Sequence, residues 1–389
     1  MNQGRTIFTQ LFDQIHPQHF DRLVHRHVPH AGRLEFSCWD QFLCMAFAQL
    51  TFRSSLRDTV DCLMARDDLL YHLGFRAPIR RSTLAEANER RDWQLYAALA
   101  QTLIRQARRL YQHDPLDTEL TTAAYVLDST TIDLCLNLFP WARFRTTKAA
   151  IKLHTLLDLR GPIPAFLSIS EGRQHDVHTL AELLVEPGAF YIMDRAYLHF
   201  AHLHTLHRAG AFFVIRAKHN LRANRVRSLP VDDTTGVRSD HLLHLHGFYS
   251  QRDYPDLLRR VRYWDKQSGR FFVYLTNHLQ LPALVVARLY KARWTVEIFF
   301  KWIKQHLRIK RFFGETANAV KTQVWIAVSV YVLVAIVRKR LGRTESLHKI
   351  LQVLSVNAFE KVPIDQLLAN GLNQNQQPDL SNQLMLFDL

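Results

Sequence analysis

The periodicity of apolar residues changes at His113-Asp114-Pro115, and this change most constrains what the chain can fold into. Before it, apolar residues recur at helical spacing, as they do from Trp93 to Tyr111. After it, short apolar runs of strand length appear, beginning with Ala124-Tyr125-Val126-Leu127. The sequence therefore predicts an all-helical N-terminal domain over residues 1–112, followed by an α/β domain.

The order of elements after residue 113 predicts a mixed sheet with helices. We expect strands at 124–127, 150–159, 164–169, 190–193 and 212–216, and helices at 178–184 and 199–208. Residues 218–280 are polar and strand-rich, with a hairpin signal at 264–270, and predict a β insertion. This order, of three strands followed by a helix, a strand, a helix and a strand, is that of an RNase-H-like core. We expect this core over residues 113–340, and a helical C-terminal segment with a flexible tail over 341–389.

The net charge of +15 indicates a polyanionic partner, and nucleic acid is the commonest one. A membrane surface is the rival partner and ranks lower, because no long cluster of Lys and Arg lies beside an anchor. The longest apolar run, Val324–Val337, is shorter than the ~20 residues that span a bilayer, so it predicts a buried helix. No signal peptide is evident and the cysteines show no metal or disulfide pattern, so we expect a reducing cytoplasm.

Two aspartates, Asp128 and Asp194, each follow a short apolar strand and precede polar residues that can expose a carboxylate. With Glu297, which lies in an amphipathic segment, they would form a cluster of carboxylates from distant parts of the chain. Hard oxygen ligands suit Mg²⁺, and a pair of such ions can activate the attacking oxygen and stabilise the leaving oxygen of a phosphoryl transfer. Each aspartate alone has an ordinary alternative as a turn or cap residue.

The segment 289–304 holds polar residues in the order Tyr-x2-Arg-x3-Glu-x6-Lys, namely Tyr290, Arg293, Glu297 and Lys304. At about 3.6 residues per turn, this spacing keeps them close to one stripe of a single helix. A carboxylate between cations suits a metal ion and a phosphodiester backbone better than it suits a core. The alternative is the solvated face of a surface helix.

This order resembles the signature of the insertion-sequence-four family of DDE transposases, which are bacterial cut-and-paste DNA transposases. Leu127-Asp128-Ser129-Thr130 and Asp194-Arg195-Ala196-Tyr197 are similar to the family motifs around the first two acidic residues. Ala196 departs from the Gly or Glu that is frequent there. Gly172-x-x-His175-Asp176 also resembles a family segment, with a structural or DNA-positioning role. The resemblance extends from residue 1 to about residue 340 and implies an RNase-H-like catalytic domain.

The resemblance implies a metal-dependent enzyme that cuts the ends of an insertion sequence and joins their 3′-hydroxyls to target DNA. Two Mg²⁺ or Mn²⁺ ions would be held, with Asp128 bridging both, Asp194 on one and Glu297 on the other. Terminal inverted repeats and target DNA would be the partners of a homodimer, at the nucleoid of a bacterial cytoplasm. The rivals are an RNase-H-like nuclease without strand transfer and a DNA-binding relic without metal chemistry.

The resemblance also places Tyr290, Arg293 and Lys304 on phosphates of the element end. Basic residues elsewhere in the core, among them Lys152 and Arg195, would extend this phosphate track. A track of this kind predicts binding that weakens steeply as the salt concentration rises.

Two further features have both a DNA-related and an ordinary interpretation. Ser82 can cap a helix that presents Asn88, Arg90 and Arg91, either as the second helix of a helix-turn-helix reader or as a surface helix with charged ends. Trp264, in the insertion, is a candidate to stack on a flipped base, as an aromatic residue does in some relatives. Its alternative is a cross-strand aromatic pair beside the hairpin turn.

The C-terminal tail ends in Gln383-Leu384-Met385-Leu386-Phe387-Asp388-Leu389. This resembles the peptide with which bacterial replication proteins bind the sliding clamp, and implies clamp contacts by Gln383, Leu384, Leu386 and Phe387. The alternative is a final turn that docks its apolar residues on the core.

Overall fold

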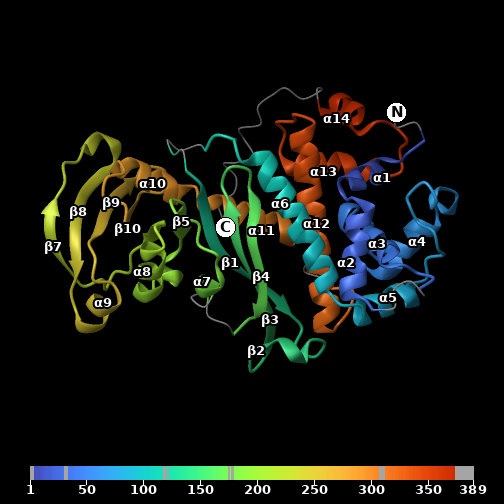
Figure 1. Cartoon of the computed structure of the whole chain (residues 1–389), viewed down its shortest axis with the longest axis horizontal. Helices are drawn as coiled ribbons and strands as arrows, with labels where there is room; N and C mark the ends of the chain where they lie inside the picture. The colour runs from blue at the N-terminus through green and yellow to red at the C-terminus, as the bar shows by residue number, and fades with distance from the viewer. Residues whose placement is uncertain are drawn as a thin grey trace.

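The computed structural model describes residues 4–29, 34–116, 120, 122–173, 176, 179–305 and 312–372. The molecule is elongated, with a helical region at one end, the central strands in the middle and the insertion at the other end (Figure 1). Within the described residues, no strand precedes Ala124, which confirms an N-terminal region built from helices.

The N-terminal helices pack around a common apolar interior. They are α1 (Ile7–Leu11), α2 (Pro17–His27), α3 (Cys38–Leu50), α4 (Leu56–Met64), α5 (Arg81–Arg90) and α6 (Gln94–Tyr111). Ser55 caps α4 by accepting a hydrogen bond from the amide of Asp58, as its sequence indicates. The cap predicted at Ser82 is wrong: α5 starts at Arg81, so Ser82 already lies inside its first turn.

A mixed sheet forms the centre of the molecule and confirms the RNase-H-like order. Its central strands are β1 (Ala124–Leu134), β2 (Arg143–Arg145), β3 (Lys148–Asp158), β4 (Ile163–Glu171), β5 (Phe190–Met193) and β6 (Phe212–Arg216). Across the sheet, β3 lies between β4 and β1, followed by β5 and β6. β1 is antiparallel to β3 and parallel to β5, and β5 is parallel to β6. The carboxyl ends of β1, β5 and β6 therefore meet at one edge.

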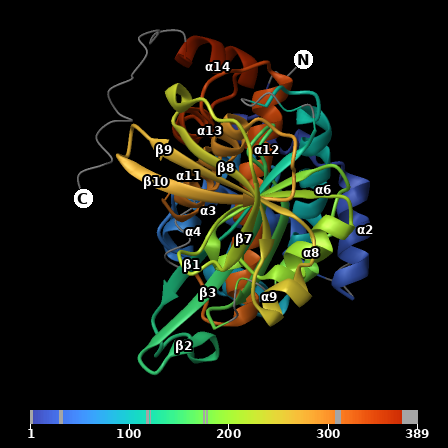
Figure 2. The same cartoon turned by 90° about the vertical axis from the view of Figure 1, so that its left-hand side faces the viewer.

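The insertion continues the same sheet instead of forming a separate one. It consists of β7 (Ala223–Ser228), β8 (Val237–Leu245), α9 (Phe248–Asp253), β9 (Leu258–Asp265) and β10 (Arg270–Thr276). β10 pairs with β6, and β9, β8 and β7 follow outward in that order, so that β7 is the edge strand. Figure 2 looks along the molecule from this end. The predicted hairpin is confirmed, because Asp265 pairs with Arg270.

Alternate residues of β1 point into two apolar layers. Val126 and Ile132 belong to the larger cluster, whereas Tyr125 and Leu127 belong to a smaller one on the other face. The connecting helices are α7 (Thr179–Glu182), α8 (Phe200–Arg208), α10 (Ala283–Lys291), α11 (Trp294–Gln305) and α12 (Ala317–Arg340), and the C-terminal helices are α13 (Leu347–Val356) and α14 (Ile364–Leu372). α8 lies near β6, and α11 lies against β1.

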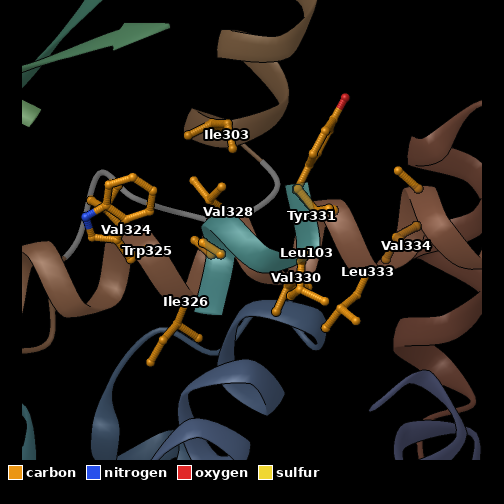
Figure 3. Close-up of a cluster of buried hydrophobic side chains, with 14 of the residues drawn as sticks. Leu103, Ile303, Val324, Trp325, Ile326, Val328, Val330, Tyr331, Leu333 and Val334 are labelled. Atoms are coloured by element: carbon orange, nitrogen blue, oxygen red, sulfur yellow. The ribbon is translucent and has the colours of Figure 1, made fainter. Parts of the chain in front are cut away.

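The apolar run at 324–337 forms the interior of α12, as predicted. α12 packs against α6, α3 and α5 of the N-terminal region and against β4 of the sheet. Figure 3 shows Leu103 of α6 and Ile303 of α11 in the same buried cluster as Val328 and Tyr331 of α12. By length and composition α12 alone among the described helices resembles a membrane span, but 94% of its most apolar window is buried inside the protein. One continuous core therefore joins the helical region to the sheet.

Candidate active site

Asp128 and Asp194 come together because β1 and β5 are parallel neighbours. Their register pairs Leu127 with Met193, and the two aspartates are the next residue on each chain segment. β1 then continues along β3 as far as Leu134. The expectation that the first strand ends at Asp128 is therefore wrong, because pairing with β3 keeps the backbone extended after β5 has ended.

The segment 289–304 forms two helices where the sequence predicted one. Tyr290 lies in the last turn of α10, Arg293 lies in the break, and Glu297 and Lys304 lie on α11. At the break, the amide of Arg293 donates to the Tyr290 carbonyl at 3.0 Å and the amide of Val296 donates to the Arg293 carbonyl at 3.1 Å. The two halves pack on different strands: α10 lies against β6, β9 and β10, whereas α11 lies against β1. This difference in packing accounts for the break.

Two signature residues bind the acidic residues directly. Nη1 of Arg293 donates to Oδ2 of Asp128 at 2.5 Å and to Oε1 of Glu297 at 3.1 Å. Because both bonds come from one nitrogen, the carboxylates of β1 and α11 approach each other across it. The hydroxyl of Tyr290 donates to Oδ1 of Asp194 at 3.0 Å. The break between α10 and α11 thus lets each side chain reach a different strand.

Burial raises the pKa of Asp128 to about 6, although the Arg293 charge and the Ser129 amide act in the opposite direction. The negative charges of Glu297 and Asp194 add to the rise. Burial, followed by the charge of Asp194, also raises the pKa of Tyr290, so its hydroxyl donates as a neutral phenol. This environment favours the approach of additional positive charge.

The three carboxylates supply the hard oxygen donors that divalent cations prefer. As placed in the described parts of the chain, no three His, Cys, Asp or Glu side chains are gathered closely enough to hold an ion. Instead, the guanidinium of Arg293 lies between Asp128 and Glu297, where it is the cation that they share. The donor set therefore fits a divalent ion, provided that this guanidinium turns away.

A second polar network lies behind Asp128, centred on Asp176. Oδ1 of Asp176 accepts from the Ser129 hydroxyl at 2.7 Å and from Nζ of Lys152 at 3.2 Å. His154, directly opposite Ser129 in the ladder, lies with Nδ1 at 3.8 Å from the same carboxylate and bonds Ser170 at 2.8 Å. Burial lowers the pKa of His154 to about 4, so its imidazole is neutral.

Sequence reasoning missed Ser129 and His154 as supports of the site. The available signal was the period of two in β3, where Lys152 and His154 interrupt an apolar strand on one face. Gly172, the first residue of the Gly172-x-x-His175-Asp176 motif, has a packing role, because a Cβ there would lie 2.8 Å from the ring of Phe144. His175 of the same motif lies outside the described residues.

The other predicted phosphate contacts are distributed around the site. Lys304 is half-buried on α11, and Arg195 is exposed in the single 3₁₀ turn that follows Asp194. Lys152 is half-buried and is held by Asp176. Arg293 is bound directly to Asp128 and Glu297.

The predicted reader helix α5 is largely engaged within the protein. Asn88 is buried and accepts a hydrogen bond from Gln41 at 2.9 Å, so it is not presented to solvent as expected. Arg91 donates to the carbonyl of Ser37 at 2.8 Å. Arg90 is exposed and pairs with Glu86 of the same helix at 2.6 Å. Of the three polar residues that α5 was expected to present, Arg90 is the accessible one.

Trp264 faces its partner across the β9–β10 hairpin. Phe271 is its register partner, and the two ring centroids are 4.6 Å apart. Arg262 covers the same Phe271 ring at 4.3 Å. This arrangement is the cross-strand aromatic pair that the sequence offered as the alternative interpretation of Trp264. The clamp-like residues Gln383, Leu384, Leu386 and Phe387 lie outside the described residues.

Comparison with known families adds an independent observation. The family model described as "Transposase DDE domain" matches residues 120–333, which include Asp128, Asp194 and Glu297. A second model, described as a domain of unknown function, matches residues 3–76. The first match thus covers the central sheet, the insertion and most of α12.

Curated relatives agree with these matches. A putative transposase from Sinorhizobium fredii is 34% identical over 261 residues, which cover 65% of this chain and 70% of the relative. A probable transposase for insertion sequence element IS5377 from Geobacillus stearothermophilus is 32% identical over 210 residues, covering 54% and 55%. A putative transposase for insertion sequence element IS4SA from Synechocystis is 21% identical over 271 residues, covering 68% and 74%.

Proposed function

Since this chain belongs to the DDE transposase family, we propose that it moves an insertion sequence by a cut-and-paste route. The chain is a metal-dependent enzyme that acts on DNA. In the proposed reaction it cuts at the element ends and joins the released 3′-hydroxyls to target DNA. The observation that carries the proposal is the meeting of Tyr290 with Asp194, and of Arg293 with Asp128 and Glu297.

Asp128, Asp194 and Glu297 are the proposed metal ligands, with Asp128 shared between two Mg²⁺ or Mn²⁺ ions. When bound, such a pair of ions acidifies the attacking water or hydroxyl and stabilises the leaving oxygen of the phosphodiester. The protein's part is to keep these carboxylates on rigid elements. Asp128 is fixed by the β1–β3 ladder, and the amide of Ser129 donates to its Oδ1 at 2.8 Å. Asp194 is oriented by the Tyr290 hydroxyl.

Arg293 and Lys304 are the proposed phosphate contacts of the element end. A guanidinium forks onto a phosphate, whereas an ammonium acts as a point charge. Arg293 would leave Asp128 and Glu297 for a DNA phosphate as metal binds, so the same side chain neutralises the site before binding and the substrate afterwards. The proposed set of DNA contacts is completed by Tyr290, Lys152, Arg195, Arg90, Arg91 and Trp264.

The wider context follows from this reaction. Two ends must be held at once, so we propose a homodimer on DNA that binds terminal inverted repeats, in the cytoplasm of a bacterium and at its nucleoid. The helical region 1–112 is the proposed DNA-binding domain, and 113–340 the proposed catalytic domain. The terminal peptide at 383–387 is proposed to bind the sliding clamp.

The test is strand cleavage and joining on DNA that carries the native element ends, with Mg²⁺ or with EDTA. We expect metal-dependent cutting and joining by the wild type, and neither by Asp128→Asn, Asp194→Asn or Glu297→Gln, while end binding persists. Asp133→Asn is the matched control, because Asp133 is an exposed carboxylate further along the same strand. This control should retain both activities.

The two rival functions give different products. Cutting without joined products would indicate a nuclease that lacks strand transfer. Specific end binding by the wild type without any chemistry would indicate a relic. Cutting and joining that survive substitution of the three carboxylates would overturn the site assignment.

A further inference from the structure

A hollow adjoins Asp194 on the side away from Asp128. It has a volume of about 510 Å³ and is lined by Asp194, Arg195, Ala196, Lys218, His219 and Asn220. These residues come from the turn after β5 and from the segment that follows β6. β5 and β6 are parallel and pair Met193 with Ile215, so both segments leave the sheet at the same edge. The hollow therefore belongs to the edge that carries the active site.

The polar side chains around this hollow are available to a ligand. Arg195, Lys218, His219 and Asn220 are all exposed. Throughout the described parts of the chain, none of these side chains makes a hydrogen bond or an ion pair with another residue. Elsewhere at the site, by contrast, Lys152 and Arg293 are paired with carboxylates. Two permanent cations and further donors facing a hollow with one carboxylate leave a surplus of positive charge, which favours an anion.

The order of strands in the sheet determines on which side of Asp194 this hollow lies. Asp128 on β1 and the helix α11 lie on one flank of Asp194, and the hollow lies on the other flank, next to β6. The residues proposed to bind the element end, Arg293 and Lys304, are on the α11 flank. In an in-line displacement the attacking and leaving groups lie on opposite sides of the reacting phosphorus. A second strand must therefore extend from the site in a different direction from the element end.

We propose that this hollow binds a phosphate, with its nucleotide, of the DNA strand that lies across the reacting bond from the element end. The inference rests on the proposed function and names a substrate contact within it. The volume falls in the usual range for small-molecule sites, about 300–1,000 Å³, and exceeds what a lone phosphate fills. Lys218 and Arg195 contact the phosphate, while His219 and Asn220 bind it or the sugar through hydrogen bonds. The strand has two possible sources, flanking donor DNA before cleavage and target DNA after it.

The experiment measures binding to three DNAs in EDTA, so that no chemistry occurs. The first is the element end alone, the second is the end with its flanking duplex, and the third is a branched product that joins the end to target DNA. The test variant is full-length Lys218→Ala/His219→Ala, in which only exposed side chains change. The control is Lys361→Ala, which removes an exposed cation from the C-terminal region. Anisotropy titrations at several salt concentrations give both affinity and salt dependence.

We expect the double variant to bind the end alone within twofold of wild type. It should bind the flanked or the branched DNA about tenfold more weakly, as fits the loss of hydrogen bonds to a charged group. The salt dependence for that DNA should also fall by about one phosphate contact. Selective loss on the flanked DNA identifies the donor strand as the source, and selective loss on the branched DNA identifies the target strand.

Equal weakening on all three DNAs, or none on any, overturns the inference. So does an equal loss in Lys361→Ala, because the effect would then report general charge. These outcomes are independent of the proposed reaction, which is judged by metal-dependent cutting and joining in the wild type. Asn220→Asp, which brings negative charge to the same lining, should reproduce the selective loss.

Discussion

Burial shifts the pKa values of two residues at the active site in opposite directions, so that both residues affect stability within the same range of pH. Burial raises the pKa of Asp128 to about 6 and lowers the pKa of His154 to about 4. The raised aspartate holds its proton more tightly in the native state, so its contribution to stability falls as pH rises from about 4 to about 6. The lowered histidine binds its proton less tightly, so its contribution rises between about 4 and 6.5. Each is on the order of 3 kcal/mol, and the two oppose each other.

We therefore expect single substitutions to reveal opposite pH dependences. In His154→Gln, where Asp128 still titrates, the free energy of unfolding should fall by about 2–3 kcal/mol between pH 4 and 6. In Asp128→Asn, where His154 still titrates, it should rise by about 2–3 kcal/mol over the same range. Urea unfolding at half-unit pH steps measures both. Asp133→Asn serves as the control for loss of an exposed carboxylate. Parallel profiles for His154→Gln and Asp128→Asn would contradict the opposed shifts.

At the scale of residues, the sequence indicated which residues form the candidate site better than it indicated which side chains they bond. Asp128 and Asp194 could be singled out because each follows an apolar run, and the strand register does place them side by side. The bond between Arg293 and Asp128 joins residues 165 positions apart, and it depends on how α11 packs on β1. A partner set by tertiary packing has no local signature, so Arg293 was expected on DNA and its bond to the carboxylates was not foreseen.

At the scale of elements, a buried ion pair joins two strands of the insertion to each other and to the segment that precedes α10. Arg259 of β9 donates to both carboxylate oxygens of Asp240 on β8, at 2.8 and 2.6 Å, and the side chains are only 5% and 2% exposed. The same guanidinium donates to the carbonyl of Leu279 at 3.2 Å, just before α10. The pair thus connects the insertion strands to the segment that leads to Tyr290.

Asp240→Ala should lower the free energy of unfolding by about 3–5 kcal/mol, because it leaves Arg259 buried without a counter-charge. The matched control lies in the same insertion: Arg238 and Asp233 form an exposed pair, so Asp233→Ala should cost less than about 1 kcal/mol. Asp240→Leu combined with Arg259→Met should recover much of the loss. Chemical denaturation compares the four proteins. Equal costs for the two alanine variants would show that burial does not govern this pair.

Elements with a repeating pattern could be predicted from sequence, whereas their interruptions could not. The helical N-terminal region, the succession of strands and helices along the chain and the buried α12 follow from apolar periodicity. The break between α10 and α11 contains no Gly or Pro, and nothing in the pattern of 289–304 interrupts helical spacing. It arises because α10 packs against β6, β9 and β10, whereas α11 packs against β1. The extension of β1 past Asp128 likewise depends on a partner strand.

At the scale of the whole molecule, the helical region and the sheet share one core. The larger apolar cluster runs from Ile7 to Leu368 and includes residues of β1 and β3. At the start of α12, Asn318 donates to the carbonyls of Asn88 and Arg91 at 2.9 and 2.7 Å. The proposed division at residue 112 is therefore a division of roles within one continuous core.

A fragment that starts at residue 113 should be insoluble or bind a hydrophobic dye strongly, because it would expose the surface of α12 that α3, α5 and α6 cover. Co-expression with residues 1–112 should restore solubility. Soluble yield, dye binding and urea unfolding of the fragment and of the full chain provide the measurement. A soluble fragment with a cooperative unfolding transition would show that the sheet folds without its helical neighbours.

The shared core also bears on how such an enzyme can be redirected to new sites. Exchanging residues 1–112, the proposed DNA-binding domain, for a different DNA reader would remove the helices against which α12 packs, and with them the support beneath α11 and Glu297. A programmable version would have to carry its new reader as an addition beside the helical region. Evolution of end specificity faces the same constraint, so changes should accumulate on exposed side chains such as Arg90 while the α3–α6–α12 contacts persist.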